Sequence, residues 1–205
     1  MRLMIAVPCG DNVRYEFCKS LVNLTQHLAE NGVDFEVHFH EGSLVYRARE
    51  ELSCEAIDQN FTHVLWLDSD MDFNIDLFDI LYGMHKPFVT GIYRSRRGDH
   101  PLALFKNIKT CEKVMSIPSE IFEVEGCGFG CVLIETEALK KIRHVYGTCF
   151  TPTMGLGEDL ALCERWVGLK EKIYANPFVL PGHVIHIPIT AKDVSKLVEF
   201  KERVV

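Results

Sequence analysis

The stretch Val64-Leu65-Trp66-Leu67-Asp68-Ser69-Asp70 decides how this chain is expected to fold. Four apolar residues are followed at once by two acids one residue apart, and Asp72 adds a third acid. Continuous apolar runs of this kind are typical of strands buried on both faces, as in a parallel sheet covered by helices. Because ligands of such sheets bind beyond the carboxyl ends of the strands, we expect Asp68 and Asp70 at the rim of a ligand crevice.

Two carboxylates that face the same way suggest a metal site. Residues two apart in an extended segment point in one direction at a spacing of about 6–7 Å. Paired oxygen ligands suit a hard divalent cation such as Mg²⁺ or Mn²⁺. The alternative interpretation is a plain acidic turn, because Asp and Ser favour turns. The motifs elsewhere in the chain favour the metal site.

The composition is that of a globular domain. The chain has 205 residues, of which 47% are hydrophobic and 25% charged, which is enough for one domain with a sizeable core. Its net charge of -7 argues against non-specific nucleic-acid binding, which usually needs a basic patch. No apolar run reaches the ~20 residues that span a bilayer, and the apolar part of residues 1–8 is too short for a signal peptide.

The cysteines favour a reducing compartment. None of the eight forms a C-x-x-C pair. Several, such as Cys18, Cys54 and Cys163, fall within apolar helical patterns, where a free thiol packs like a small hydrophobe. We therefore expect reduced thiols and a cytoplasmic location.

The first half of the chain alternates between strand and helix patterns. Apolar runs and strict alternation predict strands, and apolar residues at helical spacing predict the helices between them. The expected strands cover 3–7, 33–40, 64–67 and 88–93, and the expected helices cover 17–28, 44–59 and 75–85. Such alternation is typical of a doubly wound parallel sheet.

The second half is less regular. Short strands are expected at 101–105, 121–124, 132–134, 173–174 and 183–187, and helices at 136–146, 158–166 and the last dozen residues. A glycine-rich turn at 126–131 precedes one of these strands. Its G-x-G-x-G spacing before a strand does not match the G-x-G-x-x-G phosphate cradle, which opens a helix.

Four motifs occur in order along the chain: Val7-Pro8-Cys9-Gly10, the D-x-D of 67–70, the glycine turn at 126–131, and Gly157-Glu158-Asp159 before a helix. In this order they resemble the GT-A glycosyltransferases, and within them the inverting family 2-like group. The resemblance implies an α/β fold with a mostly parallel central sheet and a small antiparallel sheet in the second half. It also implies a single domain over 1–205, with a nucleotide-binding half at 1–97 and an acceptor-binding half at 98–205.

The resemblance assigns the first half to the donor, a nucleoside diphosphate sugar. Asp70 would bind Mn²⁺ or Mg²⁺, and Asp68 would bind the same cation or the ribose. Such a cation stabilises the charge that develops on the leaving diphosphate. His186 would be a further metal ligand, with a structural role as the alternative, and His183 is expected to point elsewhere. The other expected donor-binding residues are Pro8, Cys9, Gly10, Arg47, Ser69 and Arg94.

Two arginine groups are candidates because the guanidinium fork matches phosphate geometry. Arg47 and Arg49 lie two apart on an expected helix and cannot share one face. We assign one of them, Arg47, to the donor. Arg94, Arg96 and Arg97 follow a strand end, and Arg94 is the candidate among them.

Asp159 is the candidate general base. A partly buried carboxylate can take the proton of an acceptor hydroxyl, and Glu158 would orient the donor or the acceptor. The alternative is that both acids only complement the positive end of a helix. Gly128, Phe129 and Gly130 would form the acceptor side, with the Phe129 ring as a stacking surface for a sugar.

These assignments predict a metal-dependent transferase that moves a hexose, with inversion, from a UDP-sugar or related donor to a hydroxyl acceptor such as a carbohydrate. One alternative is a sugar-phosphate nucleotidyltransferase, which would be expected to carry a glycine-rich basic loop that residues 8–12 do not supply. Another is a nucleotide-sugar-binding module without turnover. No membrane span and no nucleic-acid partner are expected, and the sequence leaves the oligomeric state open.

Overall fold

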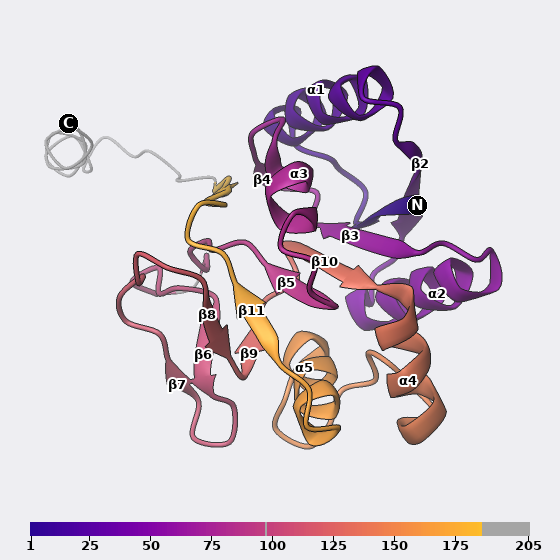
Figure 1. Ribbon diagram of the computed structural model, residues 1–205. Coiled ribbons are helices and arrows are strands. Elements are labelled where there is room, and N and C mark those ends of the chain that lie inside the picture. The colour runs from indigo at the N-terminus through magenta and orange to yellow at the C-terminus, as the bar shows by residue number, and fades with distance from the viewer. Residues whose placement is uncertain (97, 186–205) are drawn as a thin grey trace, which may run out of the picture.

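The computed structural model describes residues 1–96 and 98–185. Its centre is a seven-stranded sheet in the order β2-β1-β3-β10-β5-β11-β8 (Figure 1). The strands are β1 (Arg2–Cys9), β2 (Asp34–Glu41), β3 (His63–Leu67), β5 (Phe88–Thr90), β8 (Phe122–Val124), β10 (Cys131–Glu135) and β11 (Ile173–Ala175). Helices cover both faces, so the expected α/β class is confirmed.

The central sheet is mixed. Strands β2, β1 and β3 run parallel to one another, as expected. However, β10 from the second half inserts between β3 and β5 and runs antiparallel to both, and β8 is antiparallel to β11. Strand periodicity reports which residues are buried but not which strand becomes a neighbour, so the sequence could not show this insertion.

Alternate side chains of β1 and β3 pack under helices on opposite faces. Helices α1 (Tyr15–Glu30) and α3 (Leu77–Tyr82) cover one face. Helices α2 (Val45–Asp58), α4 (Thr136–Tyr146) and α5 (Glu158–Gly168) cover the other, as Figure 1 shows. Both faces of the sheet are therefore buried, which explains the continuous apolar run that opens the D-x-D motif.

Two smaller sheets complete the fold. Strands β6 (Leu104–Asn107), β7 (Glu112–Lys113) and β9 (Gly126–Cys127) form the small antiparallel sheet expected in the second half. Strand β4 (Met71–Asp72) pairs with β12 (Gly182–His183). The expected strand at 183–187 is described only as far as residue 185. His186 and the expected C-terminal helix lie outside the described residues.

Two further expectations can be compared with the structure. All eight cysteines are free thiols. No helix in residues 1–96 and 98–185 is both long and apolar enough to cross a bilayer.

Candidate functional site

A large cavity of about 1030 Å³ opens where β1 and β3 end. It lies at the carboxyl ends of these parallel strands, where ligands of open α/β sheets bind. Many of the residues singled out in the sequence border it together: Pro8, Cys9, Gly10, Asp68, Ser69, Asp70, Glu158 and Asp159. The structure thus brings the first strand end, the D-x-D segment and the start of α5 to one place.

A buried arginine, Arg49, joins the acidic residues of this cavity. Its side chain is only 2% exposed, and its Nη2 donates a hydrogen bond to Asp68 Oδ1 at 2.9 Å. Its Nε lies 3.5 Å from Asp159 Oδ1 and 3.8 Å from Glu158 Oε1. One guanidinium therefore faces three carboxylates, one just after β3 and two in the first turn of α5, far apart in the sequence.

Aromatic rings enclose the same guanidinium. Its Cζ lies 5.3 Å from the Phe129 ring centre and 5.9 Å from those of Trp66 and Phe150, within the range of cation–π attraction. Phe129 is itself fully buried. The expectation that its ring stacks against a sugar is therefore wrong, because the ring packs in the core beneath Arg49.

Arg49→Met is expected to destabilise the fold by about 3–5 kcal/mol, because it leaves three partly buried carboxylates without their cation. The loss should shrink as the pH falls through the raised pKa of Asp159, about 7, because a protonated carboxyl group needs no counter-ion. Chemical denaturation of both proteins at pH 8 and pH 5 measures this difference. An equal loss at both pH values would show that Arg49 acts through packing alone.

The glycine turn frames the acidic cluster with its backbone. The Phe129 N–H donates to Asp159 Oδ2 at 3.3 Å, and the Phe129 carbonyl accepts from Arg49 Nη1 at 3.4 Å. The Gly130 N–H donates to the buried Tyr93 hydroxyl at 2.9 Å, and the Gly130 carbonyl accepts from the Asp68 N–H. The turn therefore fixes Asp68 and Asp159 relative to each other.

Close approach explains the glycines in this turn. A Cβ at position 128 would lie 2.3 Å from the Tyr93 hydroxyl oxygen, and one at position 130 would lie 2.9 Å from Tyr93 Cζ. Sequence spacing alone could not show that Tyr93 makes glycine necessary at these positions.

Gly128 also borders a second pocket of about 330 Å³, between the small sheet and α5. This pocket shares Asp68, Glu158 and Asp159 with the large cavity.

Asp159 has the environment of a proton acceptor. Burial of its carboxyl group raises the pKa of Asp159 to about 7; the Arg49 charge opposes this rise, and the Glu158 and Asp68 charges add to it. Its Oδ1 is buried without a hydrogen-bond partner in the described chain, although 28% of the side chain is exposed. A carboxylate with a pKa near the working pH is suited to general base catalysis.

Asp70 lies between two basic side chains. Its Oδ2 is 2.7 Å from Arg96 Nη1, and its Oδ1 is 3.3 Å from His183 Nε2. Burial alone would raise the pKa of Asp70, but the contact with His183 and the Arg96 charge outweigh it and hold the pKa below its ordinary value. Because His183 Nδ1 donates to the Arg94 carbonyl at 3.0 Å, Nε2 faces Asp70.

The expectation that His183 points elsewhere is wrong, because His183 and Arg96 both contact Asp70. Burial lowers the pKa of His183, but the contact with Asp70 outweighs this and raises it overall. The pairing of β12 with β4 places His183 opposite Met71, next in sequence to Asp70. No local pattern reports this long-range pairing. His186, the expected ligand, lies outside the described residues.

Two expected donor-binding arginines do not border the large cavity. Arg47 is exposed and its Nε donates to the Tyr46 hydroxyl. Arg94 is exposed and donates to the His100 carbonyl. Arg49 borders the cavity instead, and a signal for it existed: it lies three and seven positions before the core residues Leu52 and Ala56.

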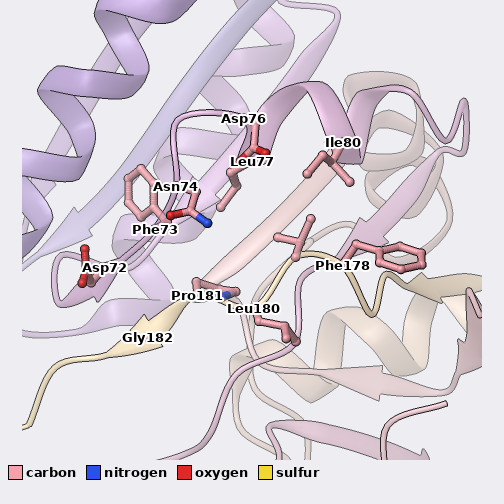
Figure 2. Close-up of a pocket in the computed structure, with 11 residues that line it drawn as sticks. Asp72, Phe73, Asn74, Asp76, Leu77, Ile80, Phe178, Leu180, Pro181 and Gly182 are labelled. Atoms are coloured by element: carbon pink, nitrogen blue, oxygen red, sulfur yellow. The ribbon is translucent and has the colours of Figure 1, made fainter. Parts of the chain in front are cut away.

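Asp72 lies away from the large cavity. It accepts a hydrogen bond from Ser20 at 2.8 Å and borders a separate cavity of about 180 Å³. Figure 2 shows this cavity between the Asp72–Ile80 segment and the Phe178–Gly182 segment, which leads to His183. Asp72 therefore bonds to Ser20 of α1 and does not face the large cavity.

Many solved structures align with this chain, among them the three that follow. A197 from STIV aligns with a TM-score of 0.64 at 22% identity, over 91% of this chain and 87% of that chain. GalNAc-T7 with UDP, GalNAc and Mn²⁺ aligns with a TM-score of 0.57 at 12% identity, over 91% of this chain but only 44% of that one. The catalytic domain of Drosophila β1,4-galactosyltransferase 7 in complex with xylobiose aligns with a TM-score of 0.55 at 13% identity, over 96% and 80%.

These similarities show an α/β fold that matches the GT-A glycosyltransferases. No protein-family model matches the chain, and no curated protein matches it in sequence.

Proposed function

We propose that the chain is a metal-dependent glycosyltransferase that transfers a hexose from a nucleoside diphosphate sugar to a hydroxyl acceptor. The observation that carries this proposal is the large cavity that both Asp70 and Asp159 border, with His183 in contact with Asp70 and the pKa of Asp159 raised. Within a GT-A-like fold, Asp70 and His183 would supply metal ligands, and Asp159 would supply a general base.

The donor would occupy the large cavity, in the nucleotide-binding half at 1–97. Its volume of about 1030 Å³ is at the upper end of the range for small-molecule sites, which suits a nucleotide with a sugar attached. Pro8, Cys9, Gly10 and Ser69 line it. Asp68 gives one carboxylate oxygen to Arg49 and keeps the other for the ribose or the cation.

The residues present fit a divalent cation. No three metal-binding side chains gather in residues 1–96 and 98–185, but Asp70 and His183 offer one oxygen and one nitrogen, and His183 Nε2 is buried without a hydrogen-bond partner. Nδ1 of the same ring donates to a carbonyl, as ligating histidines usually do. This mixed donor set suits Mn²⁺, and a bound cation stabilises the charge on the leaving diphosphate.

The acceptor would enter through the second pocket, in the half at 98–205. Gly128 lines this pocket, and Asp159 and Glu158 border both spaces. In the proposed step the acceptor oxygen attacks the anomeric carbon while Asp159 takes the hydroxyl proton. The nucleoside diphosphate leaves with the electrons of the broken bond, and a single displacement inverts the anomeric centre.

A panel of nucleotide sugars tests this function. We expect at least one UDP- or GDP-hexose to raise the melting temperature in the presence of Mn²⁺ and to be hydrolysed slowly without an acceptor. A nucleotidyltransferase would instead release pyrophosphate from a nucleoside triphosphate and a sugar phosphate. Binding of a nucleotide sugar without any turnover would identify a binding module. If no nucleotide sugar raised the melting temperature, the proposal would be contradicted.

A further inference from the structure

Arg96 contacts the proposed metal ligand directly. Its Nη1 lies 2.7 Å from Asp70 Oδ2, and its side chain is 59% exposed, whereas that of Asp70 is 13% exposed. Arg96 also borders both the large cavity and the second pocket. It therefore lies where the donor diphosphate would meet the acceptor.

We propose that Arg96 is a built-in counter-ion that holds Asp70 in the donor-free protein and moves to the diphosphate when metal and donor bind. The inference rests on the proposed function. It assigns to Arg96 a positioning role for the donor that the sequence had assigned to Arg47 and Arg94.

The position of Arg96 makes its guanidinium compete with a metal ion for Asp70. A metal ligated by Asp70 would lie about 2 Å from a carboxylate oxygen, in the space beside the Arg96 guanidinium, and the two positive charges would repel each other. Because Arg96 is exposed, the ion pair is weaker than a fully buried one. The incoming cation would replace the arginine charge at Asp70, so the release of Arg96 leaves no buried carboxylate unpaired.

The diphosphate offers Arg96 a second partner. A guanidinium binds phosphate oxygens through two parallel hydrogen bonds, and charge-assisted bonds of this kind are strong. Arg49, by contrast, is committed to three carboxylates. Arg96 therefore combines contact with Asp70 with enough exposure to turn toward the donor.

Arg96→Gln tests both halves of the inference. In the donor-free protein we expect Mn²⁺, titrated by electron paramagnetic resonance, to bind about fivefold more tightly, because the competing charge is gone. At saturating Mn²⁺ we expect the KM for the donor to rise about tenfold. Lys172→Gln is the matched control: it breaks a surface ion pair with Glu123 whose cation is 58% exposed, and it should change neither value.

Unchanged or weaker Mn²⁺ binding by Arg96→Gln would overturn the competition, and an unchanged donor KM would overturn the move to the diphosphate. The metal titration needs no donor, so it separates this inference from the proposed function. If the wild-type protein binds Mn²⁺ but turns over no nucleotide sugar, the function fails while the competition is still decided. If Asp70→Asn binds Mn²⁺ as well as the wild-type protein does, Asp70 is not the ligand and the inference fails.

Discussion

Asp70→Asn is expected to lower Mn²⁺-dependent hydrolysis of the nucleotide sugar by about a hundredfold to a thousandfold. The amide removes the charged oxygen that would bind the cation, so the leaving diphosphate loses its electrostatic stabilisation. Because Asp70 is largely buried and pairs with Arg96 and His183, the folding of the variant should be checked by circular dichroism. Release of nucleoside diphosphate, measured at several Mn²⁺ concentrations, gives the effect.

Asp72→Asn is the matched control for this variant. Asp72 lies two residues away, bonds to Ser20 and does not border the large cavity. It should keep close to wild-type hydrolysis. If Asp70→Asn stayed as active as this control, Asp70 would not be the metal ligand.

Asp159→Asn is expected to lower transfer to the acceptor by about a hundredfold to ten-thousandfold, the usual contribution of a general base. Donor binding should persist, because the proposed role of Asp159 concerns the acceptor proton. The two effects are separated by calorimetry of the donor with Mn²⁺ and by product analysis with an acceptor. Equal loss of donor binding and transfer would refute the role as base.

The raised pKa of Asp159, about 7, gives a signed pH dependence. Below this pKa the carboxyl group is protonated and cannot accept the hydroxyl proton. The kcat/KM for transfer, which reports the free enzyme, should therefore rise about tenfold per pH unit up to pH 7 and then level off. Glu164→Gln, also on α5 but outside the shared acidic cluster, should keep this profile. A profile that is flat between pH 5 and pH 8 would exclude Asp159 as the titrating base.

Local patterns were sufficient for the parts of this fold that depend on neighbouring residues. The apolar run before Asp68 predicted β3 because both faces of that strand are buried. Helical spacing located α4 and α5, and it placed Glu158 and Asp159 in the first turn of α5. These acids and the D-x-D segment border the same cavity.

The remaining features depend on long-range pairing. The insertion of β10 between β3 and β5 places the glycine turn beside Asp68, and no periodicity encodes that choice of neighbour. His183 reaches Asp70 only because β12 pairs with β4. Phe129 follows a glycine in a turn, which suggested an exposed ring, but the Arg49 charge above it and the surrounding aromatic residues make it part of the core.

The central claim is that this chain binds a nucleoside diphosphate sugar through a metal at Asp70. Isothermal titration of the wild-type protein with UDP- and GDP-hexoses, with and without Mn²⁺, tests it most directly. The account predicts binding of at least one donor that requires Mn²⁺ and is lost in Asp70→Asn. Equal binding with and without Mn²⁺, or no binding by any donor of the panel, would contradict it.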